Sequence, residues 1–131
     1  MIVVDTSAWV EFLRGTDSAV CNTVDGLLDA EDLAVTDVIS MEVLAGGRDD
    51  HHVAQLRGLL ARAAQLPTDA ASYDHAAALY RRCRRRGETV PKLIDCLIAA
   101  VVIDADASLL HADADYDVLA RHTPLRVHEV R

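Results

Sequence analysis

The chain has 131 residues, of which 51% are apolar and 26% are charged, and its formal net charge is −8. This balance excludes a disordered or fibrous chain. No apolar run approaches the ~18 residues that cross a bilayer, and no export signal follows Met1, so we expect a soluble, cytoplasmic protein with no membrane partner. Without any linker or repeat, the length predicts a single domain over residues 1–131.

Short apolar runs alternate with longer helical segments along the chain. The first run, at residues 2–4, is rich in β-branched residues and predicts a strand buried on both faces. We expect further strands at 33–35, 65–67, 108–110 and 125–127, and helices at 6–14, 18–30, 37–45, 50–64, 69–86, 93–104 and 115–121. The alternation predicts an α/β fold whose parallel sheet has about five strands and helices on both faces.

Residues that begin and end helices support these boundaries. Asp37 and Asp69 are placed to cap helix N-termini, and Gly46 and Gly87 to end helices. The helix at 93–104 is apolar on nearly every face, so we expect it in the centre of the molecule. The cysteines are odd in number and scattered, which predicts reduced, buried thiols at Cys21, Cys83 and Cys96.

Acidic residues follow the predicted strands at the edge where parallel sheets bind ligands. Asp5 follows the first strand, Glu42 lies on the helix after the second, and Asp95 begins the central helix. Glu42 has only apolar or small neighbours on its helical face, which predicts that its side chain faces the core. The strand at 108–110 is followed by three more acids, Asp113, Asp115 and Asp117.

Each acid alone has a simpler explanation. Asp5 could cap a helix, Asp95 could favour a helix N-terminus, Glu42 could meet an arginine, and the aspartates after residue 110 could form a solvated turn. Together they repel one another, because two carboxylates ~4 Å apart cost about 4 kcal/mol at an effective dielectric constant of about 20. A divalent cation removes that cost, and an all-oxygen set suits Mg²⁺ or Mn²⁺.

Four segments in order along the chain resemble the signatures of PIN-domain nucleases: 2–7 (IVVDTS), 40–44 (SMEVL), 95–100 (DCLIAA) and 111–116 (HADADY). Tyr116 stands where this family usually has Phe. The length and the near-complete coverage resemble the VapC-type toxins of bacterial toxin–antitoxin pairs. The resemblance implies a single-domain PIN-like fold.

The resemblance also implies roles for individual residues. The metal-holding, catalytic acids would be Asp5, Glu42, Asp95 and Asp113. Asp115 would be an accessory acid, and Thr6 or Ser7 would hydrogen-bond Asp5, a metal-bound water or the scissile phosphate. Hydrolysis would use water activated by Mg²⁺ or Mn²⁺, and no Ser, His and Asp spacing in the chain suggests a protein nucleophile.

The same resemblance implies a biological setting. Such enzymes cut single-stranded or looped RNA, and the toxins act on tRNA or ribosomal RNA to stop translation. They form homodimers, and a cognate VapB-type antitoxin wraps the toxin in a hetero-oligomer and blocks its cleft. We therefore expect an RNA substrate and an antitoxin partner.

Six basic residues lie between positions 81 and 92: Arg81, Arg82, Arg84, Arg85, Arg86 and Lys92. The arginines end a predicted helix, where cations complement the helix dipole. They could equally contact RNA phosphates or the antitoxin, and the sequence does not separate these roles.

Histidines and aromatic residues give weaker signals. His51 and His52 are adjacent, so they diverge on a helix and favour a surface helix start over a metal site. His111 is close to Asp113, and we expect it to support the acids rather than bind metal. Core or dimer packing is expected of Trp9, Phe12, Tyr73 and Tyr80.

Other classes of protein remain possible on sequence grounds. A phospho-receiver domain has a similar size and an acidic pocket, but it needs a lysine after a late strand, and Lys92 precedes the central helix. A haloacid-dehalogenase-type phosphatase needs a second Asp where Ser7 stands. A catalytically idle member that only binds a partner is the third alternative.

Overall fold

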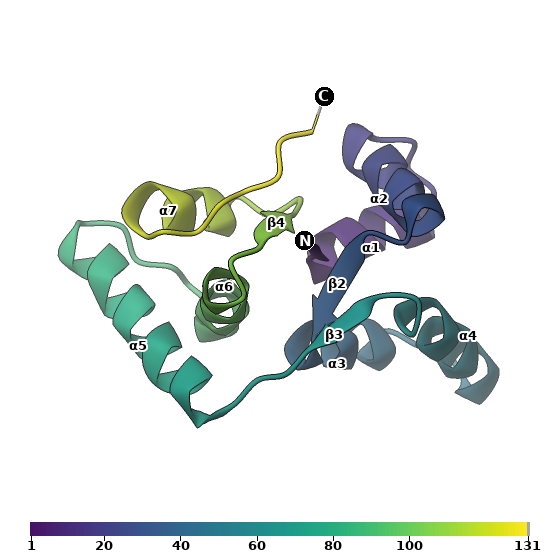
Figure 1. The fold of residues 1–131 in the computed structure, drawn as a ribbon, viewed down its shortest axis with the longest axis horizontal. Helices are drawn as coiled ribbons and strands as arrows, with labels where there is room; N and C mark the ends of the chain where they lie inside the picture. The colour runs from purple at the N-terminus through teal and green to yellow at the C-terminus, as the bar shows by residue number, and fades with distance from the viewer. Residues whose placement is uncertain (131) are drawn as a thin grey trace.

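The computed structural model describes residues 1–130. These residues form strands and helices in the following order: β1 (Ile2–Val4), α1 (Thr6–Arg14), α2 (Ala19–Ala30), β2 (Leu33–Thr36), α3 (Asp37–Ala45), α4 (Asp50–Leu60), β3 (Ala64–Leu66), α5 (Ala70–Arg85), α6 (Leu93–Asp104), β4 (Ser108–Leu110) and α7 (Asp115–His122). Figure 1 shows α5, α6 and α7 on one side of the strands and α1, α2 and α4 on the other. The predicted α/β class is confirmed.

The strands form one parallel sheet in the order β3-β2-β1-β4. From β1 the chain crosses to β2 and then outward to β3, and it later returns to the opposite side of β1 as β4. The direction of the connections therefore reverses between β1 and β4. In open α/β sheets the ligand crevice lies outside the carboxyl ends of the strands at such a switch point, so this end of β1 and β4 is where a site is expected.

The core lies against both faces of this sheet and has α6 at its centre. Eight consecutive residues of α6, from Asp95 to Val102, are buried, which confirms the central position expected from its apolar sequence. α5 packs along α6, and Trp9 of α1 is fully buried beside Phe12. Cys21, Cys83 and Cys96 are buried and unbridged, as expected.

The expected fifth strand at 125–127 is wrong. Val127 makes one isolated parallel bridge to Leu109, through bonds from Leu109 N–H to the Arg126 carbonyl and from His128 N–H to the Leu109 carbonyl. The chain follows the edge of β4 for a single residue pair only. The sheet formed by residues 1–130 therefore has four strands rather than five.

Two helix boundaries also differ from expectation. The helix expected to continue to residue 64 ends at Leu60, because Ala64 pairs with Ala34 at the start of β3. Strand pairing here overrides the helix propensity of alanine. The N-cap of α3 is Thr36, whose hydroxyl accepts the Ile39 N–H, and not Asp37. Asp37 instead accepts the Thr68 N–H from the loop after β3.

The other caps are as expected. Asp69 caps α5 in a reciprocal pair of bonds with Ser72. Gly46 is the C-cap of α3, and Gly87, at φ +89°, follows the last turn of α5. No helix in residues 1–130 combines the length and hydropathy that a membrane crossing requires.

Candidate metal centre

Asp5 lies at the end of the central strand, where β1 gives way to α1. Its Oδ2 accepts hydrogen bonds from the backbone N–H of Ser7 (3.0 Å) and from the Ser7 hydroxyl (2.6 Å). Asp5 is thus the N-cap of α1, as the simpler explanation held, and this cap fixes the direction of its carboxylate. The Ser7 hydroxyl also accepts the N–H of Ala112, which ties the turn after β4 to this point.

Two further acids follow β4: Asp113 in the turn before α7, and Asp115 as the first residue of α7. His111 Nδ1 accepts the backbone N–H of Asp113 (3.1 Å), and Asp113 Oδ1 accepts the backbone N–H of Asp115 (3.0 Å). The His111 ring is nearly buried and lies against Tyr116. His111 therefore supports the acidic turn, as the sequence suggested.

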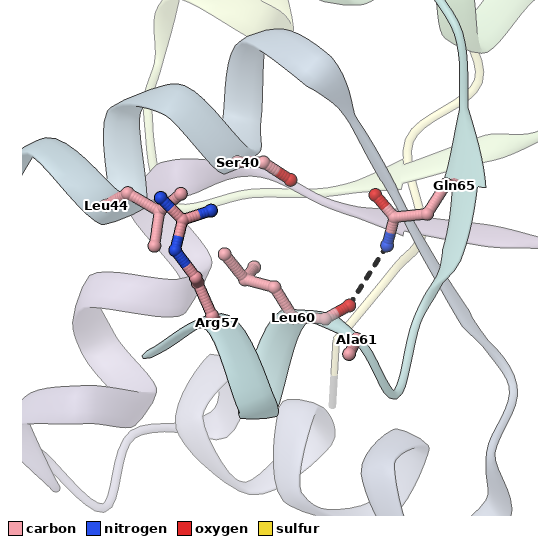
Figure 2. Close-up of a pocket in the computed structure, with 6 residues that line it drawn as sticks. All are labelled: Ser40, Leu44, Arg57, Leu60, Ala61 and Gln65. Atoms are coloured by element: carbon pink, nitrogen blue, oxygen red, sulfur yellow. Dashed lines mark hydrogen bonds between the residues drawn. The ribbon is translucent and has the colours of Figure 1, made fainter. Parts of the chain in front are cut away.

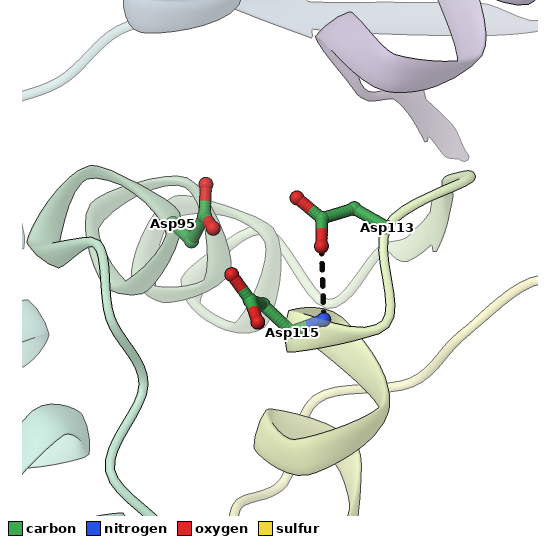
Figure 3. A group of neighbouring side chains, drawn as sticks. All are labelled: Asp95, Asp113 and Asp115. Atoms are coloured by element: carbon green, nitrogen blue, oxygen red, sulfur yellow. Dashed lines mark hydrogen bonds between the residues drawn. The ribbon is translucent and has the colours of Figure 1, made fainter.

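Three carboxylates meet where this turn faces the first turn of α6. One oxygen each from Asp95, Asp113 and Asp115 lies within 4.8 Å of the others, and Figure 3 shows the three side chains converging from α6, from the β4–α7 turn and from the start of α7. Asp95 is only 5% exposed. Within residues 1–130 its Oδ2 has no hydrogen-bond partner.

Tyr116 connects Asp5 to this group, and sequence reasoning missed it. Its hydroxyl lies 2.8 Å from Asp5 Oδ1 and 3.3 Å from Asp95 Oδ1, and the residue is fully buried. The sequence did contain a signal for this role. Tyr116 stands where the family usually has Phe, so its hydroxyl is an extra polar group that needs a hydrogen-bond partner. One phenol thus holds carboxylates from β1 and α6 in place.

Burial controls the charge states in this group. Desolvation raises the pKa of the Asp95 carboxyl to about 7, with further upward contributions from the charges of Asp113 and Asp5. Burial and the same acidic surroundings raise the pKa of the Tyr116 phenol, so it stays protonated and remains a donor.

Lys92 is the one base found against these acids among the described residues. Its Nζ lies 3.5 Å from Asp113 Oδ2, and the Asp95 and Asp113 carboxylates raise the pKa of the Lys92 ammonium. The repulsion estimated from the sequence took the acids to have no counter-charge. Lys92 supplies one. Lys92 is 59% exposed, however, and so neutralises only part of the buried charge.

Glu42 lies outside the tight group. Its Oε1 accepts the Thr6 hydroxyl (2.7 Å), one residue from Asp5. The side chain is half-buried and lines a cavity beside α1 instead of facing the core. The structure therefore gathers Asp95, Asp113 and Asp115 most closely, joins Asp5 through Tyr116, and places Glu42 one hydrogen bond further out.

The remaining candidates from the sequence lie in several places. Arg82 donates to the His122 carbonyl, and Arg84 lies over the Tyr80 ring at 5.5 Å, so part of the arginine run has structural contacts. Its role toward RNA or an antitoxin stays a prediction. Tyr73 is 61% exposed, so it does not pack in the core, and the dimer packing expected as the other possibility stays a prediction.

A second hollow lies away from these acids. Figure 2 shows it between α3, α4 and β3, where the Gln65 side-chain amide donates to the Leu60 carbonyl. It measures about 410 Å³ and is lined by Ser40, Leu44, Arg57, Leu60, Ala61 and Gln65. Its lining contains no acidic residue, histidine or cysteine, and we assign it no chemistry.

The acidic group fits a hard divalent cation. Its converging donors are carboxylate oxygens, the ligands that such ions prefer. The buried Asp95 Oδ2 is a strong acceptor that no other described group satisfies, and a buried carboxylate needs a partner or a metal. The arrangement can therefore hold a divalent cation.

The PIN domain family model matches residues 2–122. The chain belongs to the PIN-domain family. This PIN-domain chain is also 43% identical to VapC ribonuclease Mb1587 of Mycobacterium bovis and to ribonuclease VapC11 of Mycobacterium tuberculosis, and each comparison covers the full length of both chains. Membership decides against the phospho-receiver and phosphatase alternatives.

Solved structures agree with this PIN-domain fold. The VapBC2 complex of Rickettsia felis, bound to a DNA fragment from its promoter, gives a TM-score of 0.77 at 18% identity and 98% coverage of both chains. VapBC-1 of Haemophilus influenzae gives 0.76 at 14% identity and the same coverage. VapC20 of Mycobacterium tuberculosis, a toxin that cleaves the sarcin–ricin loop, gives 0.68 at 16% identity, covering 96% of this chain and 99% of that one.

Proposed function

We propose that this PIN-domain protein is the toxin of a type II toxin–antitoxin pair and acts as an endoribonuclease that depends on Mg²⁺ or Mn²⁺. The single observation that carries the metal dependence is the buried Asp95 carboxylate beside Asp113 and Asp115, whose Oδ2 has no hydrogen-bond partner within residues 1–130. Full-length similarity to VapC ribonucleases supports RNA as the substrate.

Acidic residues would hold the metal ion that hydrolysis needs. Asp95, Asp113 and Asp115 would hold the cation, with Asp5 alongside, and Glu42 would contribute from the Thr6 side. Bound there, Mg²⁺ or Mn²⁺ supplies the positive charge that lowers the pKa of water and neutralises the phosphate.

Other groups keep the acids in position. The Tyr116 phenol holds Asp5 and Asp95, while Ser7 holds Asp5 and the turn after β4. Lys92, which is mostly exposed, would stay near the phosphate as a further positive charge. The Ser7 hydroxyl is already hydrogen-bonded to Asp5 and to the Ala112 N–H, so we infer direct attack by water that leaves 5′-phosphate and 3′-hydroxyl ends.

The family setting supplies the partners. Solved relatives are VapBC complexes, which supports a VapB-type antitoxin that binds this chain and blocks its acidic site. We further propose a homodimer, a tRNA or ribosomal RNA substrate, and the cytoplasm, where those RNAs are found, as the place of action.

Cleavage of cellular RNA tests this proposal. Total RNA would be incubated with the purified chain in Mg²⁺, in Mn²⁺ and in chelator, and new 5′ ends would be sequenced. We expect discrete new 5′-phosphate ends only with metal, and none from Asp95→Asn. Asp104→Asn, an acid at the far end of the same helix, is the matched control and should cut like the wild type.

The result that overturns the proposal is equally specific. Cutting by Asp95→Asn at the wild-type rate, or equal cutting in chelator, would remove the metal mechanism. If the folded wild type binds metal but cuts no RNA, the chain is the idle binding module.

A further inference from the structure

A cavity of about 470 Å³ opens between α1, α3 and α4, beside the proposed metal centre. Its lining includes Thr6 and Glu42, the hydrogen-bonded pair next to Asp5. Any group that occupies this cavity is therefore next to the acids that would act on a phosphate.

The polar lining of the cavity is basic although the chain as a whole is acidic. Arg14 and Arg48 both line it, and neither forms an ion pair with any group in residues 1–130. Against these two guanidinium groups stands one carboxylate, that of Glu42. Arg14 also complements the C-terminus of α1, but Arg48 lies in the α3–α4 turn, outside either helix, and has no such structural role.

His52 and Gln55 add directional donors on the α4 side. The backbone N–H of Arg48 donates to His52 Nδ1 at 3.0 Å. In the neutral ring the proton therefore sits on Nε2, which makes that nitrogen a donor. The Gln55 amide lines the same cavity and can both donate and accept.

Part of the cavity lining is apolar, and we call this part its floor. It consists of side chains from all three helices: Val10, Leu13, Val43 and Leu56. Leu13 is 44% exposed. An apolar lining combined with amide and imidazole groups suits a flat, partly polar ring such as a nucleobase.

We propose that this cavity binds one nucleotide of the RNA adjacent to the bond that is cut. The base lies on the apolar floor, and Arg14 and Arg48 bind the phosphate on its far side. The proposal rests on the nuclease function proposed above and names where the substrate lies. We favour RNA over a protein segment for the following reason. When one phosphate of an RNA lies at the acidic centre, the next phosphate lies nearby, where the unpaired Arg14 and Arg48 can bind it.

Substitution of single phosphates tests the contact directly. The substrate is a short RNA around the cut site found by 5′-end sequencing, with a neutral methylphosphonate at one position on either side of the cut. Wild type, Arg14→Gln and Arg48→Gln are compared. Arg57→Gln is the control, because Arg57 is exposed on α4 and lines the separate hollow of Figure 2 instead of this cavity.

We expect each cavity variant to lower kcat/KM about tenfold, the size of one charge-assisted hydrogen bond. The methylphosphonate at one position should lower wild-type cleavage by a similar factor but affect Arg48→Gln much less, since that contact is already lost. Arg57→Gln should behave as the wild type. If the methylphosphonate lowers kcat/KM by the same factor in Arg48→Gln as in the wild type, whichever position it occupies, the proposal is overturned.

A binding measurement separates this inference from the nuclease function. Fluorescence anisotropy of a labelled ten-residue oligouridine is followed against salt for the same proteins. We expect Arg14→Gln and Arg48→Gln each to reduce the salt slope by about one, even if the wild type cuts no RNA. An unchanged slope refutes the cavity as an RNA site, and loss of antitoxin binding in its place would assign it to the protein partner.

Discussion

The hydroxyl of Tyr116 contacts two acids that come from different ends of the chain. It has one proton to donate, and the shorter contact, 2.8 Å, is to Asp5. Groups that orient metal ligands in this way tune affinity without touching the metal. The phenol ring itself is fully buried, so its packing can be kept while the hydroxyl is removed.

Tyr116→Phe should therefore weaken Mn²⁺ binding about tenfold while the fold is retained, because Asp5 and Asp95 lose their shared donor. Calorimetric titration with Mn²⁺ measures the affinity, and circular dichroism checks the fold. Tyr80→Phe removes a hydroxyl from α5, away from the acids, and serves as the control. Equal affinities for Tyr116→Phe and the wild type would show that the hydroxyl positions nothing.

Asp95→Asn should stabilise the metal-free protein although it abolishes cleavage. The buried Asp95 carboxylate faces Asp113 and Asp5 and lacks a partner for Oδ2 among the described residues, so a neutral amide costs less to bury. We expect the free energy of unfolding in chelator, measured with urea, to rise by about 1–3 kcal/mol. A loss of stability in Asp95→Asn would mean that the carboxylate has a structural partner.

The sequence identified Asp95 because an acid in an otherwise apolar helix is exceptional. It could not find the contacts of Tyr116 or Lys92, which depend on how α7 and the loop before α6 approach Asp5 and Asp113. The sequence placed Glu42 on the correct helix but predicted that its side chain faces the core. Helical spacing within α3 carries no information about the Thr6 hydroxyl of α1, to which Glu42 is hydrogen-bonded.

Among the elements, the turn between α3 and α4 depends on a close approach. A Cβ on Gly47 would lie 2.4 Å from Val53 Cγ2 and 3.1 Å from the Leu44 carbonyl oxygen. Valine is stiff at χ1 and yields little. Gly47 thus lets α4 pack near α3 and places Arg48 and His52 on the cavity.

Gly47→Ala should lower the free energy of unfolding by about 1–3 kcal/mol because the new methyl group overpacks this turn. Urea denaturation followed by fluorescence of Trp9 measures the change. Gly46→Ala is matched, since its Cβ would meet only the Val43 carbonyl oxygen at 3.4 Å. Equal stabilities of the two variants would show that the turn relaxes freely.

The attachment of α7 involves Glu88, in the loop between α5 and α6. Its carboxylate accepts bonds from Arg121 (2.6 Å) and pairs with His122 Nε2 (2.8 Å). These contacts lower the pKa of the Glu88 carboxyl to about 2. Because this pKa is depressed in the folded state, the stabilisation is complete above the ordinary value of 4.5 and is lost as the pH falls toward 2.

Glu88→Gln should therefore be less stable than the wild type at pH 6, and the difference should shrink as the pH is lowered from about 5 to about 3. The effect is small because the pair is solvent-exposed. Thermal melts across this pH range measure it, with Glu129→Gln as an exposed control. A difference that stays constant with pH would assign the effect to packing instead of charge.

Most elements could be predicted because their signals are local. The expected bounds of α1, α3 and α6 match the structure, where a cap or an apolar pattern marks each end. The errors are non-local: Ala64 joins a strand because β2 lies beside it, and the segment at 125–127 stays a single bridge on β4. Local spacing does not reveal which partner a short segment meets.

For the whole molecule, we expect divalent metal to stabilise the fold by mass action. The folded chain gathers the acids and the unfolded chain does not, so binding favours folding. Mn²⁺ at about one hundred times its dissociation constant should add about 2.7 kcal/mol to the free energy of unfolding. Asp95→Asn should lose most of this gain, and sodium chloride at equal ionic strength should not reproduce it. Equal gains in both proteins would indicate non-specific screening.

The hydrogen bond between Tyr116 and Asp5 joins residues 111 positions apart. β1 is made first, yet one of its two sheet neighbours, β4, is made almost last. During synthesis, a ribosome that has released the first hundred residues carries Asp5, Glu42 and Asp95 but not the turn that closes the group. A chain of this topology cannot assemble the acidic group until the turn after β4 has been made, because Asp113, Asp115 and Tyr116 all come from that late segment.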